Sequence, residues 1–384
     1  MRTIHKICAV LLAMLVLAGC REEDVIFVPE VVEIAQPEFN DVQGMYVLNE
    51  GNMGSNKATL DYYNFSTGRY TRNVFGFANP SVPKEMGDVG NDLGIYGSKL
   101  YAVINCSNKV DVMDKMTVKK IGQIDIPNCR YIKFYGGYAY VTSYAGPVEI
   151  REDYEQRGFV AKIDTTTLQV VDTCVVGFQP DELDIVNGKI YVANSGGYMV
   201  PNYENTLSVI DIATFKEEER IPIAINLQGC RADSHGTLWV SSRGDYYENS
   251  SMLYAYDTRH HRLLKAFDTR VSSMWLDGDS LYVIGVQFSY VTMKNEVTYA
   301  IINTATLEQV ADNFITDGTE RDITIPYAVA VHPITKDIYV TDGKDYVSPG
   351  WLFCYSAEGK LKWSVRTGDI PGHFAFLGKN INDF

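Results

Sequence analysis

The chain has 384 residues, of which 46% are hydrophobic and 21% are charged, and its formal net charge is −14. This composition is typical of a globular protein and excludes a largely disordered chain, which would be poorer in hydrophobic residues. Because binding to a phosphate backbone requires a basic surface, the negative charge argues against nucleic acid as a partner.

Residues 1–19 have the pattern of an export signal. Arg2 and Lys6 precede a short apolar run, and a membrane-spanning helix would need a longer run of roughly 20 apolar residues. The run ends in Leu17-Ala-Gly-Cys20, which resembles the lipobox of bacterial lipoproteins, in which the cysteine becomes the acylated first residue. We therefore expect a signal peptide and lipidation of Cys20. The alternative is an ordinary signal peptide that happens to contain a cysteine.

The segment after this cysteine has the pattern of a second targeting signal. Arg21-Glu-Glu-Asp24 resembles the surface-export signal of Bacteroidetes lipoproteins. Pro29 and Pro37 lie in a stretch without a clear period, so residues 20–40 are expected to form a lipidated tether. These features predict a protein that is anchored to the outer membrane by its lipid alone and that faces the cell exterior.

A sequence pattern that predicts two consecutive strands recurs along the rest of the chain. Each copy has an apolar first strand, a turn rich in Gly, Asp or Asn, and a second strand with an aromatic residue near its start. Six complete copies lie between 39 and 57 residues apart, with these aromatic residues: Tyr101, Tyr140, Tyr191, Trp239, Tyr282 and Tyr339. A period of about 40–50 residues is that of one four-stranded propeller blade.

A seventh copy is divided between the two ends of the chain. Met45–Asn49 has the pattern of a second strand without a first, and His373–Gly378 has that of a first strand without a second. Pairing the two segments closes the ring and leaves no open sheet edge at the seam. The sequence therefore predicts an all-β fold, a seven-bladed β-propeller over residues 41–384 that is closed by its N- and C-terminal strands. The alternative is a six-bladed ring with two additional strands.

Two of the second strands, Tyr140-Val-Thr142 and Ile338-Tyr-Val-Thr341, resemble the repeats of YVTN-type, surface-layer-like propellers. The resemblance extends over nearly the whole mature chain. It implies the fold and leaves the function open, because one fold carries many functions.

The loops that follow the second strands are long and rich in Tyr, Asn, Arg and Gln, whereas the turns at the opposite face are short. In a propeller these loops lie on one face, where stiff aromatic rings and amides would form a recognition surface. The alternative is that the loops only pack over the central channel. The candidate ligand-binding residues are Asn49, Asn52, Asn105, Arg130, Tyr144, Asn194, Tyr198, Arg231, Arg243, Tyr246, Tyr247, Gln287, Tyr290, Tyr346 and Trp351.

Known catalytic motifs are missing from the sequence, which contains no G-x-S-x-G, G-x-G-x-x-G, H-E-x-x-H or P-loop pattern. We therefore expect a binding protein that is not an enzyme and has no catalytic cofactor or metal centre. An alternative is a Ca²⁺ ion held in the channel by oxygen ligands that follow the second strands. These ligands would be Asn49, Glu50, Asn105, Asn194 and Asp342.

Five cysteines follow Cys20, and none of them forms a C-x-x-C pair, which argues against zinc-ribbon and thioredoxin-type sites. Cys106 and Cys129 should lie near the loop-bearing face, at the end of one blade and the start of the next. A disulfide between them is therefore an open alternative in an exported protein.

The combination of lipobox, acidic export-like segment, closed propeller and aromatic, amide-rich face resembles the surface-exposed cobalamin-binding lipoproteins of Bacteroidetes. This resemblance implies that the protein captures cobalamin (vitamin B12) as a transported ligand and passes it to an outer-membrane TonB-dependent cobalamin transporter. A flat ligand fringed with amides matches the Tyr, Asn, Arg and Gln side chains of the loops. The alternatives are capture of a siderophore or glycan, an exported propeller hydrolase or lyase, and a protein-binding scaffold for envelope assembly.

Overall fold

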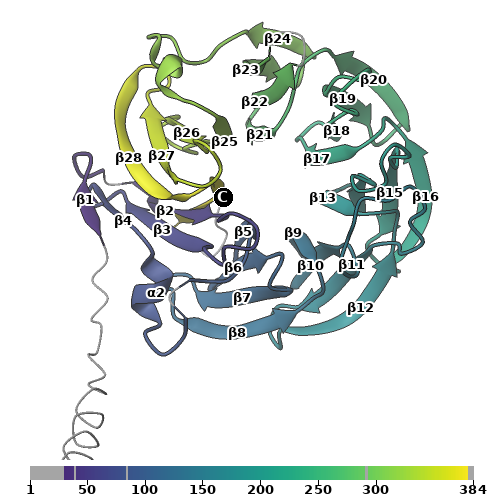
Figure 1. Cartoon of the computed structure of the whole chain (residues 1–384), viewed down its shortest axis with the longest axis horizontal. Helices are drawn as coiled ribbons and strands as arrows, with labels where there is room; N and C mark the ends of the chain where they lie inside the picture. The colour runs from purple at the N-terminus through teal and green to yellow at the C-terminus, as the bar shows by residue number, and fades with distance from the viewer. Residues whose placement is uncertain (1–29, 39, 84, 290–292, 379–384) are drawn as a thin grey trace, which may run out of the picture.

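The computed structural model describes residues 30–38, 40–83, 85–289 and 293–378. Within them the chain forms seven antiparallel sheets around a central channel, so the predicted all-β, seven-bladed propeller is confirmed (Figure 1). The predicted signal peptide, the lipidation site Cys20 and the candidate residue Tyr290 lie outside the described residues. None of the described helices has the length and apolar character needed to cross a bilayer.

We number the blades along the chain and name the strands of each blade from the channel outward. Blade 1 contains β5 (Gly90–Tyr96), β6 (Lys99–Ile104), β7 (Lys109–Asp114) and β8 (Lys120–Asp125). Blade 2 contains β9 (Cys129–Tyr135), β10 (Tyr138–Ser143), β11 (Phe159–Asp164) and β12 (Gln169–Val175). Blade 3 contains β13 (Pro180–Val186), β14 (Lys189–Asn194), β15 (Thr206–Asp211) and β16 (Lys216–Pro222).

Blade 4 contains β17 (Leu227–Ala232), β18 (Thr237–Ser242), β19 (Met252–Asp257) and β20 (Arg262–Phe267). Blade 5 contains β21 (Ser273–Asp277), β22 (Ser280–Ser289), β23 (Lys294–Asn303) and β24 (Glu308–Ala311). Blade 6 contains β25 (Pro326–Val331), β26 (Ile338–Asp342), β27 (Pro349–Tyr355) and β28 (Leu361–Asp369). Blade 7 contains β29 (Pro371–Gly378), β2 (Val42–Asn49), β3 (Thr59–Asn64), β4 (Arg69–Thr71) and β1 (Val31–Glu33). The helices α2 (Val74–Ala78) and η1 (Thr319–Asp322) lie in the connections to β5 and β25.

The two ends of the chain meet in blade 7. β29 pairs with β2, and Leu48 lies opposite His373, while β2 pairs on its other side with β3. The innermost strand of the last blade therefore comes from the C-terminus and the next strands from the N-terminus, as predicted. The six-bladed alternative is wrong, because both end segments are paired strands of one sheet.

β1 lies within the segment that was expected to be a tether. It pairs with the outermost strand β4, and all three of its residues are exposed. This strand buries no side chain. It is therefore held by backbone hydrogen bonds and by the ion pair between Arg69 and Glu33, whose atoms lie 2.6 Å apart. Blade 7 therefore has five strands instead of four.

The aromatic residues of the second strands explain how the blades pack. Tyr101, Tyr140, Tyr191, Trp239 and Tyr339 are all buried. The ring of Tyr101 contacts Phe134 of blade 2, with their centroids 4.9 Å apart. Each of the seven core clusters combines residues of two neighbouring blades. Burial of apolar surface between blades therefore drives closure of the ring.

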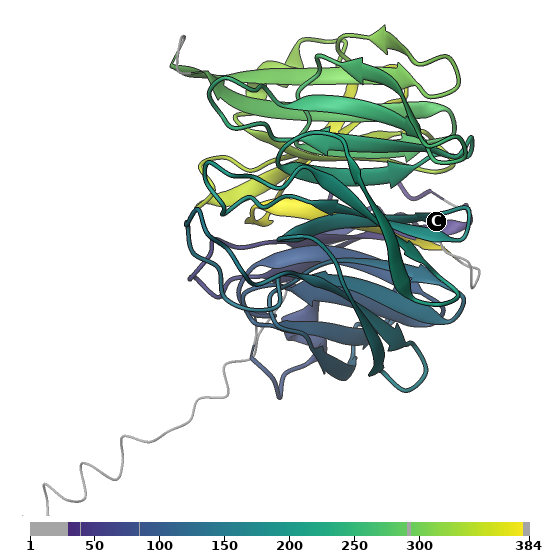
Figure 2. The ribbon, with the colours of Figure 1, turned by 90° about the vertical axis from the view of Figure 1, so that its right-hand side faces the viewer.

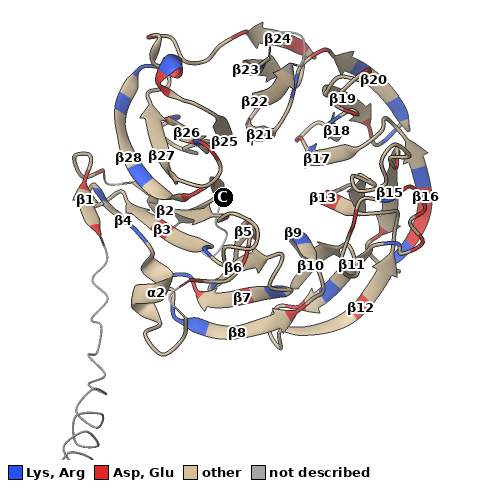
Figure 3. Ribbon diagram, viewed as in Figure 1, with Lys and Arg blue, Asp and Glu red and all other residues tan. Residues whose placement is uncertain are grey.

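The loops between the second and third strands lie on one side of the ring, which we call the upper face. The first strands begin at this face, because Gly90 at the start of β5 pairs with Ile104 at the end of β6. β22 and β23 have ten residues each, and their hairpin extends beyond the neighbouring blades (Figure 2). Charges of both signs surround the ring on its outer strands, with many on β16 (Figure 3).

Candidate ligand-binding cavity

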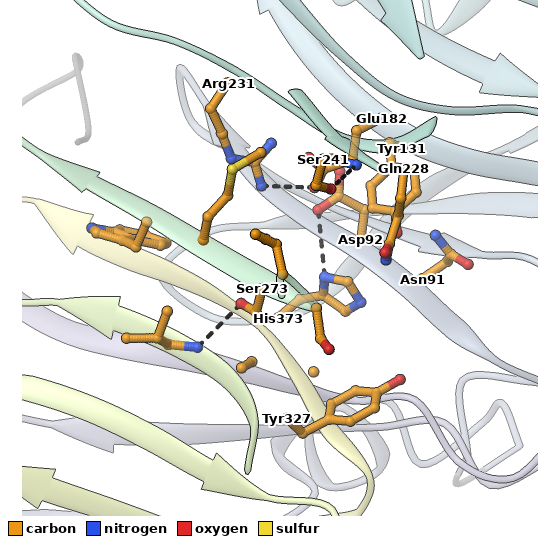
Figure 4. A pocket seen from close by; sticks show the side chains of 18 of the residues that line it. Asn91, Asp92, Tyr131, Glu182, Gln228, Arg231, Ser241, Ser273, Tyr327 and His373 are labelled. Atoms are coloured by element: carbon orange, nitrogen blue, oxygen red, sulfur yellow. Dashed lines mark hydrogen bonds and ion pairs between the residues drawn. The ribbon is translucent and has the colours of Figure 1, made fainter. Parts of the chain in front are cut away.

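The centre of the ring holds a cavity of about 820 Å³, which we call the central cavity. All seven innermost strands contribute to its wall, together with loops of the upper face and the β22–β23 hairpin. Figure 4 shows side chains from several blades converging on this space. A volume of this size is in the range of pockets that hold small ligands and cofactors.

Irregular pairing at the start of the innermost strands aims side chains into the cavity. The pairing register shifts between the first and second strands of every blade except blade 5. Bulges of this kind turn side chains away from the regular alternation of a strand. As a result, Asp92, Tyr131, Glu182 and His373, from four different blades, all line the central cavity.

The two sides of the cavity differ in polarity. The innermost strands of blades 1–4 contribute these charged residues: Asp92, Arg130, Lys133, Glu182 and Arg231. The innermost strands of blades 5–7 contribute mainly apolar or aromatic residues: Met274, Trp275, Tyr327, Ala328, Val329 and Phe374. We call these the charged wall and the apolar wall. A ligand that fills the cavity would contact both walls.

Asp181 is the centre of a charged cluster at the upper end of the charged wall. Its carboxylate is fully buried, and its Oδ1 accepts hydrogen bonds from Arg130 Nε at 3.1 Å and from the Tyr144 hydroxyl at 2.7 Å. Nη1 of Arg243 lies 3.6 Å from the other oxygen, Oδ2. Burial raises the pKa of Tyr144, so its hydroxyl keeps its proton and remains a donor. Two cavity-lining guanidinium groups therefore face one carboxylate.

A second charged pair joins blades 3 and 4. Arg231 Nη2 lies 2.8 Å from Glu182 Oε1 (Figure 4), and Glu182 Oε2 accepts the backbone N–H of Cys230 at 2.9 Å. Asp92 makes the same kind of contact between blades 1 and 2, because it accepts the backbone N–H of Ile132 at 2.8 Å. These cavity carboxylates therefore also connect neighbouring blades.

His373 lies at the seam of the ring between two carboxylates. Its Nε2 is 3.1 Å from Glu50 Oε1, and its Nδ1 is 3.8 Å from Asp92 Oδ1. The Tyr327 hydroxyl donates to the second oxygen of Glu50 at 2.8 Å. Burial alone would lower the pKa of His373, but the hydrogen bond to Glu50 and the nearby carboxylates outweigh burial and raise that pKa above its ordinary value. His373 and its partners Glu50, Asp92 and Tyr327 therefore connect blades 6, 7 and 1.

Six of the candidate residues from the sequence line the central cavity. They are Arg130, Arg231, Arg243, Tyr246, Gln287 and Tyr346. Arg130 and Arg231 belong to innermost strands, and the other four come from upper-face loops or the β22–β23 hairpin. The structure therefore brings these side chains, from four blades, together around one cavity.

Three candidate asparagines lie inside the blades, and the expectation that they face the channel is wrong. Asn194 is fully buried, and its Nδ2 donates to two hydroxyl groups of β15. Asn49 and Asn105 are also buried, with their amides bonded to β3 and to the backbone of β9. The backbone passes so closely over Asn194 that a Cβ on Gly177 would lie 2.4 Å from its amide carbon. These side chains therefore hold the blades.

Four more candidates lie outside the cavity wall. Tyr144 lies behind Arg130, whose guanidinium is 4.8 Å from its ring centroid, and Tyr198 packs edge-on against Tyr144. Asn52 donates to the backbone carbonyl of Tyr346 at 2.9 Å. Tyr247 projects into solvent and is 80% exposed. The first three support wall residues or their neighbours, and Tyr247 is a surface residue.

Trp351 is a different case, because it belongs to a regular strand. It lies in β27 opposite Asp342 and packs against the core cluster between blades 5 and 6. The expectation that it belongs to a loop of the binding face is wrong. The strand begins at Pro349, so the preceding loop is shorter than the sequence indicated.

The Ca²⁺ and disulfide alternatives do not fit the structure. The described ranges contain no group of three or more His, Cys, Asp or Glu side chains that could hold a metal ion. Asp342 uses its oxygens to accept the backbone N–H groups of Thr324 and Ile325. Cys106 and Cys129 are both free thiols, and Cys129 is buried with its Sγ directed at backbone carbonyls of blade 1.

Sequence reasoning missed several residues at the beginning of the innermost strands. The missed cavity residues are Asn91, Asp92, Tyr131, Glu182, Gln228, Tyr327 and His373. A signal was present, because polar pairs such as Asn91-Asp92 and Asp181-Glu182 stand where an apolar strand begins. The pairing is irregular at both of these pairs, and at least one member of each lines the cavity.

The fold and the central cavity define the class: a seven-bladed propeller with a ligand-sized cavity at its centre. The chain belongs to the family described as domain of unknown function DUF5074, whose model matches residues 43–376. No curated protein matches the chain.

Two solved structures show a similar fold. Hydrazine synthase of Kuenenia stuttgartiensis is 15% identical, with a TM-score of 0.58, over 77% of this chain and 94% of that chain. A hypothetical selenium-binding protein from Sulfolobus tokodaii is 11% identical, with a TM-score of 0.61, over 90% of this chain and 95% of that chain. At these identities the likeness shows the propeller fold alone.

Proposed function

We propose that this protein is a surface lipoprotein, anchored through Cys20, that captures cobalamin in the central cavity and passes it to an outer-membrane TonB-dependent transporter. The observation that carries the proposal is the composition of the cavity. One wall offers charged and amide groups, and the other offers aromatic and apolar surface. Cobalamin combines a broad flat ring with a fringe of amides, so it can use both walls at once.

The upper face supports the capture of a ligand larger than the cavity. Tyr246 and Tyr346 line the cavity and are 48% and 41% exposed, so their rings are accessible from the cavity and from solvent. Aromatic rings and amides at a cavity rim give contact area at low entropic cost. A ligand that projects from the cavity would therefore gain contacts on the surrounding loops.

The arrangement of His373 supports binding in preference to catalysis. Both of its ring nitrogens face carboxylates, Glu50 at 3.1 Å and Asp92 at 3.8 Å, so a role as a base would compete with these contacts. Glu182 is likewise occupied by Arg231 and a backbone N–H group. A general base must reach the proton that it removes. Capture without a chemical step needs no such group.

The cargo is tested by incubating the purified protein with cyanocobalamin, desalting it and recording the visible spectrum. The proposal predicts that the cobalamin spectrum stays with the protein. A parallel incubation with a ferric siderophore and with a glycan tests the alternative cargoes. Retention of one of these with no retention of cobalamin would replace the cargo, and retention of none would contradict capture by this cavity.

The anchor is tested in cells. Cys20→Ala is expected to release the protein from the membrane or leave it as a precursor, because the acylated cysteine is the proposed anchor. Proteinase added to intact cells is expected to degrade the wild type. Protection of the wild type in cells that are verified to be intact would place the protein inside the envelope and contradict surface capture.

A further inference from the structure

Arg243 is a cation with almost no partner inside the protein. It follows β18 on the upper face and lines the central cavity, and its side chain is 32% exposed. Its nearest acidic atom is Asp181 Oδ2 at 3.6 Å, which is longer than a hydrogen bond. Within the part of the chain that the structure describes, the guanidinium of Arg243 donates no hydrogen bond.

Asp181 is already neutralised by another residue. Arg130 contacts its Oδ1 through both Nε and Nη2 at 3.1 Å, and the Tyr144 hydroxyl donates to the same oxygen. Oδ2 has no hydrogen-bond partner. The cluster therefore carries two guanidinium charges against one carboxylate. The upper end of the charged wall has a surplus positive charge in a chain whose net charge is −14.

We propose that Arg243, supported by Arg130, forms a binding subsite for one phosphate ester group of the captured ligand. The proposal rests on the proposed function of the same cavity and names the part of the ligand that this corner holds. A guanidinium presents a planar fork of N–H donors that matches two phosphate oxygens. Asp181 fixes Arg130 and leaves the Arg243 fork available.

The chemistry of cobalamin fits this corner. Its amides are neutral, and its single phosphodiester is the anionic group that joins the ring to the nucleotide base. With the phosphodiester at Arg243, the flat ring faces the apolar wall, where Trp275 and Tyr327 lie. Charge complementarity of this kind fixes the orientation of a ligand as well as its affinity.

The test compares cyanocobalamin with dicyanocobinamide, which keeps the corrin ring but lacks the phosphodiester and the base. Calorimetric titration of wild type and Arg243→Gln is expected to show cobalamin binding weakened about tenfold or more and cobinamide binding unchanged. Arg243→Lys keeps the charge without the fork and should fall between. The matched control is Arg157→Gln, because Arg157 stacks over Phe178 outside the cavity wall.

A second variant separates anion binding from support of the fold. Asp181→Asn removes the carboxylate that both guanidinium groups face, so it is expected to strengthen the binding of inorganic phosphate, whereas a merely structural cluster would bind no better. Thermal melting identifies any variant that fails to fold. Excess inorganic phosphate should compete with cobalamin in wild type and not in Arg243→Gln.

The outcomes distinguish the subsite from the cargo. Equal loss of cobalamin and cobinamide binding in Arg243→Gln, or no loss of either, overturns the subsite and leaves cobalamin capture standing. Binding of inorganic phosphate that Arg243→Gln abolishes, with no corrinoid bound by wild type, supports the subsite and overturns the cargo. Wild type that binds neither phosphate nor cobalamin overturns both.

Discussion

The beginnings of the first strands and the ends of the second strands lie together at the upper face, but their polar side chains point in opposite directions. Glu182, on a first strand, lines the central cavity. Asn194, on the second strand of the same blade, is fully buried and bonded to the third strand. The difference teaches that a position at a strand end does not by itself bring a side chain to the channel, and that in blade 3 the side chain that reaches it lies where the pairing of the first strand is irregular.

The most severe way to break this comparison is to remove β29, the first strand of blade 7, which pairs with the second strand β2. Ending the chain before His373 removes the buried residues Phe374 and Phe376 and leaves β2 without its inner partner. We expect unfolding or aggregation, visible in thermal melting and gel filtration. A chain that ends after Gly378 is the control. Unchanged melting of the shorter chain would contradict closure by β29.

A second test removes a side chain from the end of a second strand. Asp342 is fully buried and accepts the backbone N–H groups of Thr324, Ile325 and Lys344. Asp342→Ala is expected to lower the free energy of unfolding by about 3 kcal/mol, because it leaves these donors unpaired. Denaturant unfolding measures the loss. Cobalamin affinity should stay within about twofold, and a stable variant with lost affinity would reverse the roles assigned to the two regions.

A third test acts on the cavity and leaves the fold intact. Tyr246→Ala removes a half-exposed ring from the cavity wall and is expected to weaken cobalamin binding about tenfold, or about 1.4 kcal/mol. The melting temperature should not change. Tyr135, which is 52% exposed and precedes the β9–β10 turn on the opposite face, provides the matched control Tyr135→Ala. Equal effects of the two substitutions on binding would show that Tyr246 does not contact the ligand.

The smallest expected effect is a pH dependence of the melting temperature, caused by His373 at the seam of the ring. The folded-state pKa of His373 lies above its ordinary value of 6.5, so its charge stabilises the fold below that pH. This contribution is lost as the pH rises through the raised pKa. The groups that face it are Glu50, Asp92, Glu182 and the ring of Tyr131.

The measurement is the melting temperature of wild type and His373→Gln from about pH 6 to about pH 9. The difference between the two proteins should be largest at the acidic end and shrink as the pH rises. Burial lowers the pKa of His332 to about 4, so His332 destabilises the fold towards the acidic end of this range. This contribution is present in both proteins and cancels in their difference. A difference that grows with pH would contradict a charged His373 in the folded protein.

The architecture could be predicted from the sequence because it repeats. Tyr101 and Tyr140 recur at the same place in their blades, and the two halves of the split copy complement each other, which favours a closed ring of seven blades. The cavity could be predicted only in part. Loops such as the one with Tyr246 were found by composition, whereas Asn49 and Asn194 were misplaced because the sequence does not show which side of a strand end is covered by the next backbone segment.

The residues that were missed have a physical reason in common. His373 is the one titratable residue of β29, and Glu182 lies between Asp181 and Leu183 in β13, so neither position follows a regular alternation that would mark it as facing the channel. The bulge that turns these side chains inward is a feature of pairing between two strands. The pairing register shows it directly, whereas a single segment of sequence shows it only indirectly, through a polar pair such as Asp181-Glu182 at the start of a strand.

The most direct test of the account is a calorimetric titration of cyanocobalamin into wild type, Tyr327→Ala and Asn194→Ala, with thermal melting of each. Tyr327 begins a first strand on the cavity wall, and Asn194 ends a second strand inside its blade. The account predicts that wild type binds cobalamin, that Tyr327→Ala weakens binding about tenfold or more, and that Asn194→Ala lowers the melting temperature with its affinity unchanged. Wild type that binds no cobalamin at micromolar concentration, or binding that is lost in Asn194→Ala and retained in Tyr327→Ala, would contradict it.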